Sequence, residues 1–443
     1  MLLAAVCSAC LIGLASAATT GGHDVAVPPK TTGGGVLKPM LHIEWRRLPD
    51  FPKQGTKAYP SGLEAASGGW VDDDTVISAF GYASGGKTAF INSAWLLNIT
   101  SSKGWQRLPD APVPGRQGAG AAVVGGAVYF VGGFSYNAPY TYSDVLKLQR
   151  QSNGAWGWSK LPPFPHPITA YSSLVAVGTK LYSVGGAYYT ADVKAEAGFY
   201  VNQTGKQLWS LDTAAPAAGW TRLQDLPSTA RWVHSVSAVG SKIIVIGGAR
   251  SNVGTPTTSL IDNWGYDTAG KRGWSRLADL PLASSNFPGN GNRAFMDRYL
   301  ILIGGYQYTN VTLVNGSNIR SFGNPQRMCT AAQLAGKKPA HCRPGCTPTV
   351  ATGEYFNDIF VYDAVADLFG VATANASAAE QCLLRPQCGP FPQNNNMPQV
   401  SVNLEQVFVN GGEVDVQTIC GEAYQHYPTL ALHGQITILP LAQ

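Results

Sequence analysis

Residues 105–134 read WQRLPDAPVPGRQGAGAAVVGGAVYFVGGF, and this stretch holds the two signatures from which the fold follows. It opens with Trp-x-Arg-Leu-Pro and ends in an apolar run closed by Gly132 and Gly133. A short apolar strand can leave its sheet at two glycines, because a turn with positive φ strains other residues but not glycine. The stretch therefore predicts a strand that stops at Gly132-Gly133. A Trp on a later strand is expected to cover the bare glycine backbone.

Both signatures recur along the chain. The apolar run occurs as VISAFGY 76–82, VYFVGGF 128–134, LYSVGGA 181–187, IIVIGGA 243–249, LILIGGY 300–306 and VFVNGGE 407–413. The second signature begins at Trp45, Trp105, Trp158, Trp220 and Trp274. The spacing from Trp to the first glycine of the next doublet is 27 residues in three successive copies and 30 in the next. A repeat of about 50 to 60 residues is too long for a solenoid turn and fits a propeller blade of four short strands.

The repeat resembles the kelch family, whose blades carry the same Gly-Gly strand end and trailing Trp. The resemblance covers about residues 37–443 and implies an all-β, six-bladed kelch-type β-propeller. Three departures stand out: the Tyr-Asp pair of the family is clear only at 266–267 and 362–363, Phe80-Gly81 replaces the first doublet, and Phe369 stands where a sixth Trp is expected.

The two ends of the chain predict how the ring closes. HIEWRRLP (42–49) precedes every glycine-ended run, and LALHGQITIL (430–439) follows the last one. Pairing of these two runs would complete the last blade with an N-terminal strand and remove an exposed sheet edge. A seventh blade would need a hidden repeat between Gly305 and Gly412, so the excess there is interpreted as insertions at about 306–353 and 370–398.

The first 36 residues predict export. Residues 1–17 carry no charge, have an apolar middle and end in Ala15-Ser16-Ala17, as a cleaved secretory signal peptide does. A Gly/Pro-rich linker follows at 18–36. Nothing after Ala18 approaches the ~18 apolar residues of a transmembrane segment. We therefore expect a secreted, extracellular protein.

Cysteines and glycosylation sequons agree with this expectation. After signal cleavage the chain keeps Cys329, Cys342, Cys346, Cys382, Cys388 and Cys420. An even count favours three disulfide bonds, whose pairing the sequence leaves open, and a zinc site is the weaker alternative. Asn-x-Ser/Thr sequons predict a glycoprotein at Asn98, Asn202, Asn310, Asn315 and Asn375. In the kelch architecture the cysteine-bearing loops project to one end, where the disulfides would tie a cap over the channel mouth. The alternative is that the disulfides only stabilise these long loops.

Composition limits the partners. Only 13% of residues are charged, the net charge is +5, and no basic run occurs, so nucleic-acid binding is not expected. No phosphate-binding glycine loop, zinc-protease helix or calcium loop is present, and we expect no metal or cofactor. The oligomeric state stays open.

Ligand-binding candidates come from the kelch resemblance. Counting back about sixteen residues from the glycines, to the start of each innermost strand, gives Glu64, Arg116 and Arg231, with His234 and Arg293 close by. Related propellers use such arginines to hold anionic groups, and a guanidinium suits a carboxylate. The alternatives are hydrogen bonds to loop carbonyls for each arginine and a packed ring for His234.

Two hypotheses about function follow. The first is that the protein binds an extracellular carbohydrate, glycoprotein or acidic peptide at the arginine-bearing channel mouth. The second is a sugar-processing enzyme. In its six kelch copies and its final Gly-Gly-Glu at 411–413 the sequence is similar to bacterial sialic acid mutarotases, which place Arg and Glu at the channel for acid–base catalysis. Galactose oxidase also has a kelch-type core, but its copper ligands cannot be identified among the seven His of this chain.

Overall fold

The structure is a computed structural model. It describes residues 37–55, 60–83, 89–167, 169–189, 199–251, 258–270, 272–281, 292–305, 359–374, 398–403, 406–412, 415–419, 422–426 and 429–440. The predicted signal peptide, linker and six cysteines lie outside these ranges, as do Glu413, Asn310, Asn315 and Asn375. Among the described residues no helix is long and apolar enough to cross a membrane.

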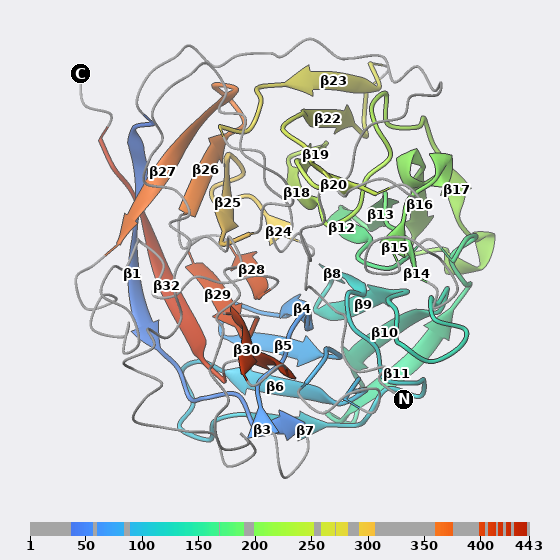
Figure 1. Cartoon of the computed structure of the whole chain (residues 1–443), viewed down its shortest axis with the longest axis vertical. Helices are drawn as coiled ribbons and strands as arrows, with labels where there is room; N and C mark the ends of the chain where they lie inside the picture. The colour runs from blue at the N-terminus through green and yellow to red at the C-terminus, as the bar shows by residue number, and fades with distance from the viewer. Residues whose placement is uncertain are drawn as a thin grey trace.

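The described chain is almost wholly β, and its first half forms four-stranded antiparallel sheets (Figure 1). The first sheet holds β4 (Ser67–Trp70), β5 (Thr75–Ala79), β6 (Ala94–Asn98) and β7 (Gln106–Leu108). The second holds β8 (Gly120–Val124), β9 (Ala127–Val131), β10 (Val145–Arg150) and β11 (Trp156–Leu161). The third holds β12 (Ser173–Val177), β13 (Lys180–Val184), β16 (Leu208–Asp212) and β17 (Thr221–Arg222).

The fourth sheet adds a parallel strand to the same pattern. It holds β18 (Ser235–Val239), β19 (Lys242–Ile246), β22 (Asn263–Asp267) and β23 (Trp274–Leu277), with β24 (Asn292–Arg293) parallel to β18. The described residues also form separate two-stranded sheets: β2 (Gln54–Gly55) with β3 (Pro60–Ser61), β14 (Tyr188–Tyr189) with β15 (Phe199–Tyr200), β20 (Ala249–Arg250) with β21 (Thr258–Ser259), and β30 (Asp415–Ile419) with β31 (Glu422–His426). Two 3-10 turns, η3 (Gln203–Lys206) and η4 (Pro216–Ala218), flank β16.

The remaining strands form one seven-stranded sheet, in the order β25-β26-β27-β1-β32-β29-β28. Their bounds are β25 (Tyr299–Ile303), β26 (Ile359–Asp363), β27 (Leu368–Ala374), β1 (Pro39–Arg47), β32 (Ala431–Ile438), β29 (Gln406–Asn410) and β28 (Gln399–Asn403). β1 runs antiparallel to β32, from Leu41 opposite Ile438 to Arg47 opposite Leu432, and parallel to β27. The first and the last described strands of the chain are therefore neighbours, shown in blue and red (Figure 1).

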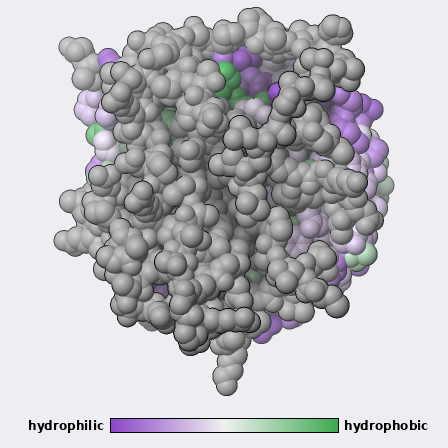
Figure 2. Space-filling view, in the orientation of Figure 1, coloured by the Kyte–Doolittle hydropathy of each residue, from purple (hydrophilic) through white to green (hydrophobic). Residues whose placement is uncertain are grey.

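The strands β4, β8, β12, β18, β24 and β28 lie around the centre of the molecule (Figure 1). Each of them contacts the next in this order, and β28 contacts β4. The space-filling view from the same side shows mainly hydrophilic described residues along the right edge, where the outer strand β17 lies (Figure 2). Apolar side chains thus face other strands, while the outermost strands carry the polar surface.

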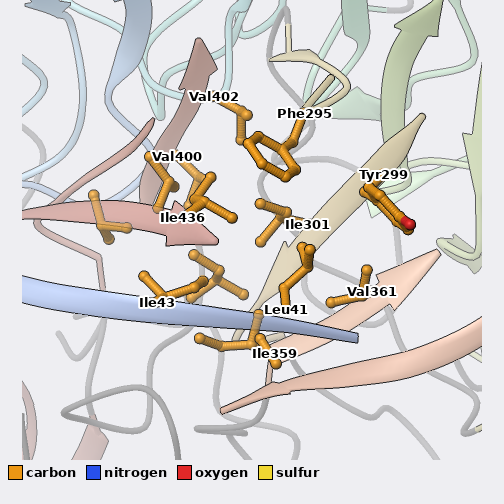
Figure 3. Close-up of a cluster of buried hydrophobic side chains, with 14 of the residues drawn as sticks. Leu41, Ile43, Phe295, Tyr299, Ile301, Ile359, Val361, Val400, Val402 and Ile436 are labelled. Atoms are coloured by element: carbon orange, nitrogen blue, oxygen red, sulfur yellow. The ribbon is translucent and has the colours of Figure 1, made fainter. Parts of the chain in front are cut away.

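The core lies between facing strands. In the largest cluster, side chains from β1, β25, β26, β28 and β32 point toward one another, among them Leu41, Ile301, Val361, Val400 and Ile436 (Figure 3). All five are 5% exposed or less. Alternation along each strand places these residues on the inner face of the pleat. This packing, together with the β1–β32 ladder, holds the two ends of the described chain.

The glycine doublets adopt the predicted backbone. Both glycines have positive φ in the doublets Gly132-Gly133, Gly185-Gly186, Gly247-Gly248, Gly304-Gly305 and Gly411-Gly412. In the first copy Phe80 takes the first position with a φ of 60°. This conformation costs an L-residue about 1–2 kcal/mol. The Phe80 ring is fully buried against Phe130 and Trp158, which offsets the strain.

The predicted role of the Trp signature was wrong. A Cβ on Gly132 would collide with Thr169, and one on Gly185 with the His234 ring, so these residues and not Trp cover the two glycines. The reason is position: the Trp belongs to the fourth strand of a sheet, and the glycine doublet ends the second. The indoles instead donate hydrogen bonds to carbonyls of the preceding sheet, at the residue that follows the Leu of its Trp signature: Trp105 to Pro49 (2.9 Å), Trp158 to Pro109 (2.8 Å), Trp220 to Pro162 (3.2 Å) and Trp274 to Gln224 (2.9 Å).

Candidate functional site

Four of the five candidate residues lie in segments that lead into central strands: Glu64 before β4, Arg116 before β8, and Arg231 and His234 before β18. Arg293 lies on the central strand β24 itself. The second glycine of a doublet donates its N–H to the carbonyl of such a segment: Gly81 to Arg116, Gly133 to Thr169, Gly186 to Arg231 and Gly412 to Leu63, at 2.7–3.1 Å. The last of these bonds joins the final doublet to the first sheet in the way that consecutive sheets are joined. These main-chain bonds also define which residues are equivalent between sheets.

The register corrects one sequence-based assignment. Leu63, not Glu64, is the equivalent of Arg116, since the Leu63 carbonyl accepts the bond from Gly412. Glu64 instead forms an isolated bridge with Tyr82, as Gln117 does with Phe134. The first copy holds one more residue between the segment and its glycine, so the count of sixteen fails there.

Arg116 is buried, with 1% of its surface exposed. Its Nη1 donates to the carbonyl oxygen of Gly132 at 3.1 Å and to Oδ2 of Asp144 at 3.0 Å. The guanidinium lies 3.9 Å from the centre of the Tyr142 ring. Burial lowers the pKa of Arg116, and the charge of Asp144 opposes that shift. The side chain thus fastens its own loop to the turn at Gly132.

Arg231 repeats this arrangement two sheets later. It is fully buried, and its Nη1 donates to the carbonyls of Gly247 (2.9 Å) and Asp262 (3.0 Å). Its Nη2 donates to Asp262 Oδ2 at 2.6 Å. Burial would raise the pKa of Asp262, but the Arg231 charge and hydrogen bonds from Ser228, Arg231 and Trp264 lower it to about 2. Both buried arginines therefore match the alternative reading, in which they bind loop carbonyls.

His234 is a packed histidine. It is 2% exposed, and its ring lies against Gly185. Burial, followed by the Arg231 charge, lowers the pKa of His234 to about 3, so the ring is neutral at pH 7. Its backbone carbonyl accepts a hydrogen bond from Ser173 Oγ at 2.9 Å. The ring fills the space above a glycine that has no side chain of its own.

Arg293 differs from the other two arginines. It lies on β24 at the centre of the molecule, opposite Ala238 of β18, and its side chain is exposed. Of the three candidate arginines, Arg293 is therefore the one whose side chain is exposed. Glu64, 1% exposed, precedes β4 at the same set of segments. The order of contacts places β28 between β4 and β24.

Sequence reasoning missed an aromatic cluster at this end. Phe134 packs on Phe199 (ring centres 4.9 Å apart) and on Tyr171 (5.1 Å), and Phe199 stacks on Trp232 at 4.6 Å. Tyr136 and Tyr189 extend the cluster and are partly exposed. The sequence contains a signal for this cluster, since two aromatic residues occur within three positions after the doublets in GGFSY (132–136) and GGAYY (185–189).

The anchoring aspartates were also missed. Asp144 and Asp262 each come immediately before the third strand of a sheet, β10 or β22, and each forms an ion pair with a buried arginine. Within the described ranges, no group of three or more His, Cys, Asp or Glu is placed to hold a metal ion.

Comparison with known proteins gives two findings, while no protein-family model matches the chain. The chain is 25% identical over 284 residues to N-acetylneuraminate epimerase of Pasteurella multocida (strain Pm70), which covers 58% of this chain and 69% of that protein. The structure of YjhT superposes with a TM-score of 0.55 and 19% identity, covering 86% of this chain and 95% of that one. The chain therefore has the kelch-propeller fold of YjhT and is distantly similar to N-acetylneuraminate epimerase.

Proposed function

We propose that this protein is a sugar-processing enzyme of the epimerase or mutarotase type that acts on an acidic sugar. The observation that carries the proposal is the similarity to N-acetylneuraminate epimerase over 284 residues. Of the two hypotheses drawn from the sequence, this supports the enzyme better than the pure binding protein. Binding of an extracellular glycoprotein or acidic peptide has less support, because Arg116 and Arg231 are already bonded to loop carbonyls and aspartates.

The chemistry of the central segments suits such a substrate. The carboxylate of an acidic sugar is a natural partner for a guanidinium, and Arg293 is exposed at the centre. Exchange of anomers requires proton transfer at the ring oxygen and at the anomeric hydroxyl. We assign Arg293 to the substrate carboxylate. We assign proton transfer to the carboxyl group of Glu64, which is 1% exposed, so this role requires the segment before β4 to open when the sugar binds. His234 does not take part, since its ring is packed against Gly185.

We further infer a closed six-bladed propeller with β1 completing the last blade. The closed order of contacts among the six central strands supports this count. The antiparallel β1–β32 ladder and the bond from Gly412 to Leu63 support closure. Secretion, three disulfide bonds and glycosylation at the five sequons remain part of the proposal, supported by the sequence of residues 1–17, the even cysteine count and the sequons themselves.

Proton NMR of fresh N-acetylneuraminate tests the activity. The enzyme is expected to accelerate equilibration of the anomers, and both Glu64→Gln and Arg293→Ala are expected to reduce that acceleration at least tenfold, the equivalent of about 1.4 kcal/mol of barrier. Arg222→Ala is the matched control, because Arg222 lies on the exposed strand β17 and pairs with Asp225 in the loop that follows. Saturation transfer to the sugar without faster exchange would instead identify a carbohydrate-binding protein. Exchange that is fast in all variants would exclude these two residues.

A further inference from the structure

A groove of about 650 Å³ lies between the first and second sheets. It is built from the turns β4–β5, β6–β7, β8–β9 and β10–β11, which lie at the other ends of the strands from the glycine doublets. The apolar side chains Leu96, Leu108 and Trp156 line it and also pack on the core beneath. Polar groups share the lining, including Asp72 and Arg150. A half-exposed indole among amide and charged side chains is the composition of a site for a sugar ring.

Asn98 lines the same groove and begins the sequon Asn98-Ile99-Thr100. Its Oδ1 accepts hydrogen bonds from the backbone N–H (3.1 Å) and the hydroxyl (2.8 Å) of Thr100. Its Nδ2 donates to Oγ1 of Thr75 at 3.3 Å, directly across the β5–β6 ladder. An asparagine amide has two N–H hydrogens, so one can be replaced while the other keeps the bond to Thr75.

We propose that Asn98 carries an N-linked glycan whose first N-acetylglucosamine residue packs in this groove against Trp156. The inference rests on the proposed secretion, because the modification is made in the secretory pathway. The glycan comes from a lipid diphosphate donor: the bond from Nδ2 to C1 of the sugar forms, the C1–O bond to phosphate breaks, Nδ2 loses one proton, and the lipid diphosphate leaves. The attached sugar then bridges two neighbouring sheets.

The second described sequon provides an internal control. Asn202 is exposed and caps η3, with its Oδ1 accepting from the N–H of Thr204. It is not among the residues that line the groove. A glycan at Asn202 would therefore not occupy this groove, so the two sites are expected to behave differently although both carry the same chemistry.

A double-mutant cycle on the protein secreted from eukaryotic cells tests the packing. Peptide mapping after enzymatic glycan release first determines whether Asn98 is occupied. Asn98→Gln is expected to lower the Tm by about 2 °C in the wild-type background and by less than half of that in Trp156→Ala. The control cycle with Asn202→Gln is expected to be additive. An unoccupied Asn98, or additivity in both cycles, would overturn the proposal.

A measurement without mutation covers the case in which Trp156→Ala fails to fold. With ¹³C-labelled N-acetylglucosamine, protons of the first sugar on Asn98 are expected upfield of those on Asn202, because of the indole ring current. Identical shifts at the two sites would contradict the packing. Binding of free N-acetylglucosamine in the groove of the glycosylated protein would also contradict it, since the groove would then be open. None of these readouts depends on sugar turnover, so failure of the proposed enzyme activity is distinguishable from failure here.

Discussion

The second and the fourth sheet each contain a buried arginine that binds a glycine carbonyl and an aspartate, but the two aspartates differ in their exposure to solvent. In both, a buried arginine ties the segment before the central strand to the carbonyl of the first doublet glycine. The partner Asp144 in the second sheet has a side chain that is 33% exposed, whereas that of Asp262 in the fourth is 13% exposed. Water can replace part of the first ion pair but little of the second. The contribution of such an anchor therefore depends more on the burial of the aspartate than on the arginine.

The largest expected effect is that of Arg231→Met. Removing the guanidinium leaves the carboxylate of Asp262 buried without its charge partner, which costs about 3–5 kcal/mol of unfolding free energy. Chemical denaturation measures it, with Arg222→Met on exposed β17 as the control near zero. A loss below about 1 kcal/mol would show that Ser228 and Trp264 are sufficient partners for Asp262.

The next largest effect is expected in the dependence of the unfolding free energy on acidic pH. The pKa of Asp262 is about 2 in the folded protein and near 4 in an unfolded chain. A lowered folded pKa contributes stability that is present above pH 4 and is lost as the pH falls toward 2. The expected loss of unfolding free energy over this window is about 2 kcal/mol. Chemical denaturation at a series of pH values measures it. Asp262→Asn is expected to remove this part of the pH dependence, and an unchanged acid limb in that variant would assign it to other carboxyl groups.

Arg116→Met sharpens the comparison directly. Because Asp144 is partly solvated, we expect a smaller loss than for Arg231→Met, about 1–2 kcal/mol, part of it from contact with the Tyr142 ring. The measurement is the same denaturation series. Equal losses for the two arginines would mean that the hydrogen bond to the doublet glycine, Gly132 for Arg116 and Gly247 for Arg231, contributes more to stability than the ion pair with the aspartate.

Trp158→Phe has the smallest expected effect. It removes one indole hydrogen bond to the Pro109 carbonyl of the neighbouring sheet and keeps the ring against Phe130, a loss of about 0.5–1 kcal/mol. Thermal unfolding checks it. Trp209→Phe removes an indole hydrogen bond to the side chain of Gln207, two residues away along the chain. The Gln207 amide can hydrogen-bond to water instead, so a smaller loss of stability is expected. A larger loss there would argue against a special role for bonds between sheets.

Local sequence patterns predicted much of this fold. A positive φ strains other residues but not glycine, so the turn at a glycine doublet can be predicted from the two residues alone. The positive φ at Gly132-Gly133 and its counterparts follows from that rule. The target of each Trp could not be predicted in the same way, since the carbonyl of Pro109 belongs to a neighbouring sheet.

The candidate site was less predictable than the fold. The one-residue shift at Glu64 depends on which carbonyl Gly412 reaches, and the spacing alone does not contain that information. Whether an arginine faces a ligand or a loop depends on distant partners such as Asp144 and Asp262. Arg116, Arg231 and Arg293 look alike in the sequence, and only their surroundings separate two anchors from one exposed side chain.

The pairing of β1 with β32 has a consequence for biosynthesis. From Arg47 at the end of β1 to Ala431 at the start of β32 is a distance of 384 residues. At about 5–20 residues per second, the ribosome needs roughly 20–80 s to make the partner that β1 requires. During this time Leu41, Ile43 and Trp45, all buried in the finished molecule, have no strand β32 to cover them. The first described strand is thus among the last to be completed, and a chaperone that shields it would act on the nascent chain throughout synthesis.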